Sequence, residues 1–208
     1  MSKNRPIVLT IAGFDPSGAA GVLADVKTFE QHKVYGFAIN TANTIQTENE
    51  FHKIQWTSID FVLESITALL NSYDIKAVKI GIVPSLDYLS QIIFCIKKHS
   101  LAIKIVWDPV LKSSTDFEFL DIKNQNLFKE ILAEINLTTP NYNEMQKLFR
   151  DFNTNSNTLP SEIKGVLLKG GHNPNEIGVD YLYTQNNIQK FLPKTVNCYE
   201  KHGSGCVL

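Results

Sequence analysis

Residues 6–29 read "PIVLTIAGFDPSGAAGVLADVKTF" and combine two elements in quick succession. The run from Pro6 to Gly13 is apolar and rich in β-branched residues, which favours a buried strand. After a glycine-containing turn, apolar side chains recur at helical spacing, at Val22, Leu23, Val26 and Phe29. A strand that leads directly into a helix is typical of a parallel sheet, whose neighbouring strands need crossover connections.

The same alternation continues to the end of the chain. Further strands are expected at 36–43, 75–81, 103–110, 136–141 and 165–171. Helices are expected at 17–34, 58–73, 85–100, 126–135 and 144–152. Residues 179–193 predict a hairpin that turns at 185–187. The pattern predicts a three-layer α/β fold, with a mostly parallel sheet between helices and an antiparallel hairpin at one edge.

Composition limits the class of protein. The 208 residues, 43% of them hydrophobic and 20% charged, predict one globular domain over residues 1–208. The net charge of -1 gives no basic field for nucleic acid. No stretch approaches the roughly 20 apolar residues of a membrane span, so no membrane partner is expected. Three cysteines without a C-x-x-C pair argue against disulfides or zinc and favour a cytoplasmic protein.

Polar motifs follow the expected strands with unusual regularity. They are "FDPSG", "NTIQT", "IVP", "WDPV", "TPNYNE" and "KGGH" in chain order. In open α/β sheets ligands bind beyond the carboxyl ends of the strands. Loops at one edge of the sheet therefore favour a shared site, although each motif alone is weak.

Two of these polar residues suit the edge of a heterocycle. Asp25 lies in the first expected helix, one turn after Gly21, and its oxygens can accept from a hydroxyl or a ring amino group. Gln46 follows a strand and offers both a donor and an acceptor. The alternatives are a solvated helix aspartate and a polar loop residue. Likewise, Gly13, Asp15, Gly18 and Gly21 can belong to a loop of the shared site or only to a tight strand-to-helix turn.

A second set of residues suits phosphate and a hard cation. Asp108 ends one strand, and Glu144 opens a helix just after Asn141. Two carboxylates at one edge can position Mg²⁺ through water, or they can simply end a strand and favour a helix dipole. Lys169 precedes two glycines at a strand end, where an ammonium suits phosphate oxygens.

Several familiar nucleotide and metal motifs are absent from the sequence. It contains no G-x-x-x-x-G-K-[ST] loop and no dinucleotide fingerprint with the expected glycine spacing. Its five histidines show no H-x-x-x-H spacing for a metal. Nucleotide binding, if present, must use another arrangement of residues.

The final residues, "HGSGCVL" from His202, combine a Gly-x-Gly turn with a cysteine. Backbone N–H groups around Ser204 can form an anion hole at a helix start, which would favour the thiolate of Cys206. A buried structural thiol beside a glycine turn is the other interpretation. Cys95, within "IIFCIKK", fits the structural interpretation.

Taken together, the motifs resemble one family. "TIAGFDPSGAAGVLADVKTF", "VKIG", "WDPV", "TPNYNE", "LLKGGH" and "KHGSGC" occur in the order found in hydroxymethylpyrimidine and phosphomethylpyrimidine kinases. The resemblance covers the chain from about Pro6 onward. It implies a ribokinase-like fold and an ATP- and Mg²⁺-dependent kinase of thiamine biosynthesis. The substrates would be 4-amino-5-hydroxymethyl-2-methylpyrimidine and its monophosphate, and a homodimer is expected.

The resemblance also implies a role for each matching residue. The pyrimidine pocket would be lined by Gly13, Asp25, Gln46 and Val110. The ATP phosphates and Mg²⁺ would face Asn141, Glu144, Lys169 and Asp108, with Asp108 and Glu144 as the metal residues. The anion hole would be formed by Gly203, Ser204 and Gly205. Cys206 would be the base or positioning group, and Lys169 would also serve catalysis.

Some residues differ from the family pattern, which affects the expected shape of the pocket but not the class of enzyme, and two alternatives to the leading function remain. Phe14, Ala19 and Ile82 stand where the family usually has Ser or Thr, Gly, and often Met. A pyridoxine or pyridoxal kinase is the nearest enzymatic alternative, and a non-catalytic pyrimidine binder is another. Family members continue past the position of Leu208 into a helical segment, so that part is expected to be missing from this chain.

Overall fold

One nine-stranded sheet runs through the part of the chain that the computed structural model describes, which is residues 5–47, 49–112, 117–149 and 159–194. The strands are β1 Ile7–Phe14, β2 Tyr35–Gln46, β3 Phe51–Trp56, β4 Ile75–Ile80, β5 Lys104–Trp107, β6 Leu137–Thr138, β7 Gly165–Leu168, β8 Asp180–Thr184 and β9 Ile188–Phe191. The helices are α1 Gly21–Gln31, α2 Ile59–Ser72, α3 Leu86–His99, α4 Gln125–Glu134, α5 Tyr142–Leu148 and the 3₁₀ helix η1 Gly170–His172.

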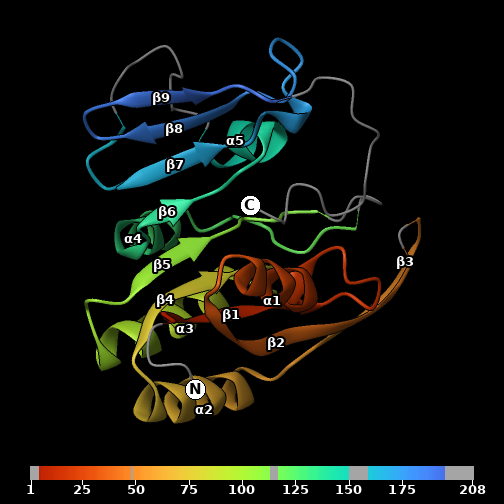
Figure 1. The fold of residues 1–208 in the computed structure, drawn as a ribbon, viewed down its shortest axis with the longest axis vertical. Helices are drawn as coiled ribbons and strands as arrows, with labels where there is room; N and C mark the ends of the chain where they lie inside the picture. The colour runs from red at the N-terminus through yellow and green to blue at the C-terminus, as the bar shows by residue number, and fades with distance from the viewer. Residues whose placement is uncertain (1–4, 48, 113–116, 150–158, 195–208) are drawn as a thin grey trace.

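The sheet has the order β3-β2-β1-β4-β5-β6-β7-β8-β9. The strands from β2 to β7 in this order pair in parallel, whereas the pairs β2–β3, β7–β8 and β8–β9 are antiparallel. The predicted α/β fold, mostly parallel with an antiparallel hairpin at one edge, is confirmed. Figure 1 shows a second hairpin at the opposite edge, formed by β2 and β3, which the sequence pattern did not predict.

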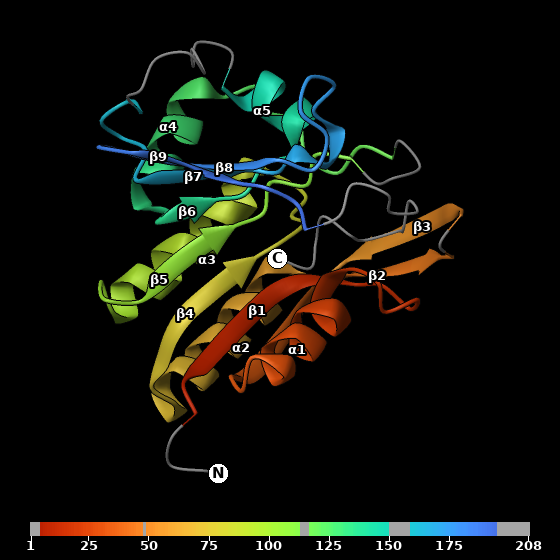
Figure 2. The same ribbon diagram turned by 45° about the horizontal axis from the view of Figure 1, so that its top comes forward.

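Helices cover both faces of the sheet. Helix α1 packs on β1 and β2, while α2, α3 and α4 pack side by side as one layer. Figure 2 shows α1 in front of the sheet, with α2 and α3 behind it. Alternation along the strands separates the two faces. On β1, Leu9 and Ile11 are fully buried on the face opposite Thr10, and each is worth about 1.5–3 kcal/mol of hydrophobic stabilisation.

Several predicted element boundaries were wrong. The predicted strands 103–110, 136–141 and 165–171 end at Trp107, Thr138 and Leu168, and the predicted helices 17–34 and 144–152 end at Gln31 and Leu148. The second strand does not end at Asn43 but continues to Gln46, so Gln46 is a strand residue and not a loop residue. Its continuation is stabilised by pairing with β3. The first helix begins at Gly21 and not at Ser17, because the Asp15 carboxylate accepts from the backbone N–H groups of Ser17 and Ala20 and holds this segment as a turn.

The β2–β3 hairpin packs against the segment that follows β5. Phe51 of β3 stacks on Phe117 with ring centroids 4.6 Å apart and meets Phe119 edge to face at 5.6 Å. The backbone N–H of Phe119 donates to the carbonyl of Leu111. These contacts connect the end of β2 to the residues just beyond β5, although the two lie far apart in the sequence.

Within the described ranges, no helix is long and apolar enough to cross a membrane.

Candidate active site

A buried ion pair lies at the carboxyl ends of β5, β6 and β7. Asp108 follows β5 directly, and its Oδ1 accepts from Lys169 Nζ at 2.8 Å and from Thr139 Oγ1 at 3.2 Å. Thr139 follows β6, and Lys169 follows β7. Both charged side chains are at least nine-tenths buried. Three successive strand ends therefore meet at one carboxylate.

The start of α5 adds a second carboxylate to this group. Asn141 and Glu144 form a reciprocal capping box: the Asn141 side chain accepts from the Glu144 N–H at 2.9 Å, and Glu144 Oε2 accepts from the Asn141 N–H at 2.7 Å. Burial raises the pKa of Glu144 to about 7, partly offset by the Asn141 hydrogen bond and by the positive charge of Lys169. The negative charge of Asp108 also contributes to the raised pKa.

The turn after β7 fixes the position of Lys169. Its backbone N–H donates to the carbonyl of Pro140 at 2.9 Å, which pairs it with the start of α5. The next N–H, that of Gly170, donates to the Asp180 carboxylate at 2.8 Å. A Cβ on Gly170 would lie 2.0 Å from the Val179 carbonyl oxygen, so only glycine fits this close approach.

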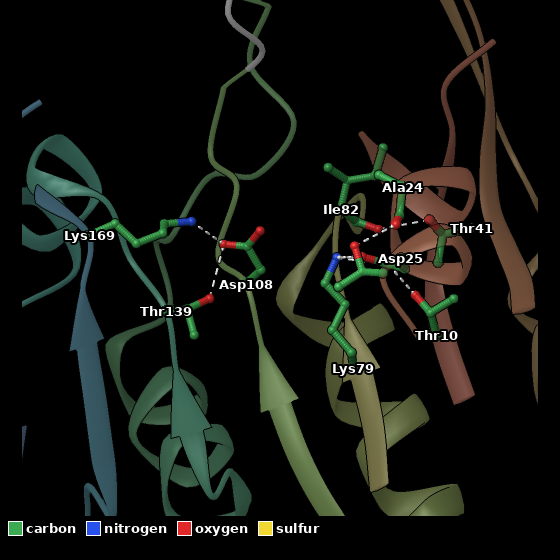
Figure 3. Close-up of polar contacts among 10 residues, drawn as sticks. Thr10, Ala24, Asp25, Thr41, Lys79, Ile82, Asp108, Thr139 and Lys169 are labelled. Carbon is green, nitrogen blue, oxygen red and sulfur yellow. Dashed lines mark hydrogen bonds and ion pairs between the residues drawn. The ribbon is translucent and has the colours of Figure 1, made fainter. Parts of the chain in front are cut away.

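A second, largely buried ion pair joins Asp25 on α1 to Lys79 near the end of β4. The Lys79 ammonium donates to both oxygens of Asp25, at 3.0 and 2.9 Å, and the Thr10 hydroxyl donates to Oδ2 at 2.5 Å. Figure 3 shows this pair and the Asp108–Lys169 pair at the same edge of the sheet, with Lys79 on β4 and Asp108 just after the neighbouring strand β5. The backbone N–H of Asp108 donates to the Ile80 carbonyl and so ties the two strand ends together.

Gly13 lies where the chain leaves β1. A Cβ there would lie 2.5 Å from Cδ1 of Ile82, and the Gly13 carbonyl oxygen would lie 2.0 Å from a Cβ on Gly21. Gly21 has a φ of +61°, so the start of α1 can approach β1 closely only with glycine. The Ile82 carbonyl accepts from the Thr41 hydroxyl at 2.8 Å, which fixes the segment after β4 (Figure 3).

Gln46 and Val110 come from the two segments joined by the phenylalanine contacts. Gln46 pairs with Phe51 at the end of β2 and is half-buried. Val110 is also half-buried, and its N–H donates to the Asp108 carbonyl at 2.9 Å. Val110 therefore lies beside the Asp108–Lys169 pair, whereas Gln46 is connected to the site through Phe51 and Phe119.

The predicted anion hole at Gly203, Ser204 and Gly205, with Cys206, lies outside the described residues. Of the other predicted residues, the structure brings Asp108, Asn141, Glu144, Lys169 and Val110 into one connected group. Asp25 lies on α1, where Thr10 and Lys79 hold it, and α1 packs on β1, the strand that carries Gly13.

Sequence reasoning missed three polar residues of these groups: Thr10, Lys79 and Thr139. Lys79 could have been found from its position, because it lies between Val78 and Ile80 in a buried strand, where a lysine needs a partner. Thr10 interrupts an apolar strand in the same way.

The arrangement suits transfer of an anionic group. A lysine ammonium, two neighbouring carboxylates and a helix start lie together at one edge of the sheet. A third carboxylate, that of Asp25 on α1, lies at the same edge. Such groups can bind a polyphosphate and neutralise charge that develops during transfer.

Comparison with known proteins agrees with this chemistry. The family model described as phosphomethylpyrimidine kinase matches residues 15–208. The chain belongs to the phosphomethylpyrimidine kinase family. A hydroxymethylpyrimidine/phosphomethylpyrimidine kinase from Aquifex aeolicus is 31% identical over 210 aligned positions, which cover 97% of this chain and 82% of the relative. One from Staphylococcus aureus strain MSSA476 is 32% identical, over 96% of this chain and 76% of the relative.

Solved structures of kinases share the fold. The crystal structure of a phosphomethylpyrimidine kinase from Clostridium difficile 630 matches with a TM-score of 0.75 and 29% identity, over 90% of this chain and 84% of that one. A Bacillus subtilis pyridoxal kinase in complex with ADP matches with a TM-score of 0.78, over 98% of this chain and 80% of that one. Its identity is only 24%, so this likeness concerns the ribokinase-like fold alone. As a member of the phosphomethylpyrimidine kinase family, the chain is a phosphotransferase.

Proposed function

We propose that this kinase uses ATP to phosphorylate the hydroxymethyl group of 4-amino-5-hydroxymethyl-2-methylpyrimidine, and then the resulting monophosphate to the diphosphate, in thiamine biosynthesis. The observation that carries the proposal is the Asp108–Lys169 pair beside Glu144, at the strand ends next to Asp25, in a chain of this family. The proposal assigns the two neighbouring groups to the two substrates.

The group around Asp108 is assigned to ATP. Lys169 would bind phosphate oxygens, and Asn141 at the start of α5 would lie beside them. Asp108 and Glu144 would hold Mg²⁺, with water and phosphate oxygens completing its coordination. The donors fit this ion, because Mg²⁺ prefers carboxylate oxygens. Asp108 follows β5, and Glu144 lies on α5, after the neighbouring strand β6. The ion would neutralise phosphate charge during transfer.

The group around Asp25 is assigned to the pyrimidine. A carboxylate is an acceptor, which suits an amino or hydroxyl hydrogen of the substrate. Gln46 would bind the ring edge from β2, and Gly13 and Val110 would complete the pocket with backbone and apolar surface. The close approach at Gly13 leaves no room for a larger residue unless Ile82 moves.

Transfer itself is assigned to the residues near the end of the sequence. The backbone N–H groups of Gly203, Ser204 and Gly205 would form the anion hole for the transferred phosphoryl group. Cys206 would accept the proton of the attacking hydroxyl or orient that hydroxyl. These roles are proposed from the family motif "KHGSGC".

Turnover of ring alcohols by the purified protein tests the proposal. The pyrimidine alcohol, pyridoxine and pyridoxal are each incubated with ATP and Mg²⁺, and the phosphorylated products are separated by anion-exchange chromatography. Formation of pyrimidine monophosphate and then diphosphate is expected. Phosphorylation of pyridoxine or pyridoxal alone would make the protein a kinase of those alcohols instead. Pyrimidine binding without any phosphorylation would make it a non-catalytic binder.

A homodimer in the cytoplasm completes the proposal. Light scattering of the purified protein should give twice the mass of one chain. Fractionation of cells that express the tagged protein should recover it without membranes. A monomer, or recovery in the membrane fraction, would contradict these two parts without affecting the catalytic assignment.

A further inference from the structure

Lys79 makes a bidentate contact with a carboxylate inside the fold. Its Nζ lies 3.0 and 2.9 Å from the two oxygens of Asp25, and their side chains are 18% and 6% exposed. The two residues are 54 positions apart in the sequence. With the hydroxyl of Thr10, both oxygens of Asp25 accept hydrogen bonds from the protein.

The sheet register explains how the two donors converge. Thr10 on β1 and Lys79 on β4 are direct partners across neighbouring parallel strands. Directly paired residues point to the same face, and here both reach α1, which carries Asp25. A Cβ at Gly81 would lie 3.6 Å from Lys79 Nζ and 2.9 Å from Cβ of Ala12, so small residues leave room for the ammonium.

We propose that Lys79, assisted by Thr10, is a positioning residue that fixes the Asp25 carboxylate in one orientation for the ring alcohol. The proposal rests on the proposed function, in which Asp25 contacts that substrate. A carboxylate whose two oxygens are both held by hydrogen bonds cannot rotate freely, so it loses little freedom when the substrate binds. Its remaining lone pairs can still accept hydrogen bonds from the substrate. The aspartate would contact the substrate, and the lysine would act through the aspartate.

A purely structural role accounts less well for this arrangement. Replacing a buried ion pair by apolar residues of similar volume is often neutral or stabilising. The sequence neighbours of Thr10 and Lys79, which are Leu9, Ile11, Val78 and Ile80, are apolar and fully buried on the opposite face of the sheet. The charged pair lies on the face of the sheet that α1 covers. Lys79 is the next-to-last residue of β4, so the pair lies near the edge that carries the Asp108–Lys169 pair.

Calorimetric titrations with separate ligands test the positioning role. The pyrimidine alcohol, pyridoxine and ATP are titrated individually into the wild-type protein, Lys79→Met and Lys76→Met. Lys76 is the matched control, because it lies on the same strand and pairs with the exposed Asp74. Lys79→Met should weaken binding of the ring alcohol by at least about tenfold and leave ATP binding unchanged. Lys76→Met should bind both ligands as the wild type does.

A double-mutant cycle separates action through Asp25 from direct contact. In an Asp25→Asn background, Lys79→Met should cause no further loss of ring-alcohol affinity, because the group that it positions is already altered. Additive losses would overturn the proposal, as would unchanged ring-alcohol affinity in Lys79→Met. If the wild-type protein binds neither ring alcohol, the proposed function is refuted, and so is the positioning role that rests on it.

A crystal structure of the wild-type protein with the bound ring alcohol decides the matter if Lys79→Met does not fold. Lys79 Nζ should remain within hydrogen-bonding distance of both Asp25 oxygens while Asp25 contacts the ligand. Separation of Lys79 from Asp25, or a ligand that Asp25 does not touch, would overturn the proposal.

Discussion

Lys169 donates to Asp108 over 2.8 Å, although the two residues are 61 positions apart in the sequence. One follows β7 and the other follows β5, and Thr139, after the intervening strand β6, donates to the same carboxylate. The pair therefore depends on correct pairing of three strands. It also places the Lys169 ammonium where an anionic substrate can contact it, and the Asp108 carboxylate where a cation can contact it.

Removal of the Lys169 charge should affect both folding and activity. Lys169→Met leaves Asp108 buried without its lysine, and breaking a buried ion pair costs about 3–5 kcal/mol. Turnover of a variant that still folds should fall by about 10²-fold or more, because a group that stabilises developing charge is lost. Urea denaturation and the kinase assay measure the two effects.

The control for this change is Lys164→Met, just before β7, where the lysine is exposed. Its free energy of unfolding should stay within about 0.5 kcal/mol of wild type, with unchanged turnover. Equal behaviour of the two variants would show that the buried pair contributes to neither property.

Glu144 should make the stability depend on pH. Its pKa is raised from 4.5 to about 7, chiefly by burial. Between these values the folded protein keeps a proton that the unfolded chain has released, so stability falls as pH rises through this window, by roughly 3 kcal/mol at most. Glu144→Gln retains a side chain suited to the capping box and removes the titration. Urea denaturation between about pH 5 and pH 8 should give a flatter profile for the variant. Parallel profiles would refute the role of Glu144.

Much of the architecture could be predicted from the sequence because its signals are local. Strand and helix patterns, and polar residues at strand ends, led to the α/β sheet and to the group of Asp108, Asn141, Glu144 and Lys169. The capping box spans one helical turn, so the sequence contains all of it. The strand β3 was missed because its residues are exposed or half-buried and its pairing with β2 depends on aromatic contacts from beyond β5.

The partners of Asp25 could not be predicted, because they come from register and not from spacing. Thr10 and Lys79 converge only once β1 and β4 pair with these residues opposite each other. The sequence indicates that a lysine in a buried strand needs an anion, but several carboxylates were available. Which one it meets is decided by how α1 crosses the sheet.

Cys206 is predicted to serve the chemical step. Cys206→Ala should lower turnover by roughly 10²-fold or more, since a base or positioning group is removed, and should leave pyrimidine affinity unchanged. Single-turnover kinetics and calorimetry of the same preparation measure these two quantities. Cys95→Ala is the control, because Cys95 lies on α3 against Thr67, on the layer of helices opposite α1. Wild-type turnover in Cys206→Ala would show that the thiol of Cys206 has only a packing role.

The turn after β7 offers a matched pair of glycines. A Cβ on Gly170 would lie 2.0 Å from the carbonyl oxygen of Val179, whereas a Cβ on Gly171 would have no atom within 4 Å among the described residues. Gly170→Ala must therefore displace the backbone that carries Lys169 and break the hydrogen bond from Gly170 to Asp180. We expect it to destabilise the protein by about 2 kcal/mol or more and to weaken ATP binding, while Gly171→Ala folds as the wild type does. Thermal denaturation and ATP titration compare the two variants. Equal stability of both variants would mean that the turn accommodates the added methyl group without moving Lys169.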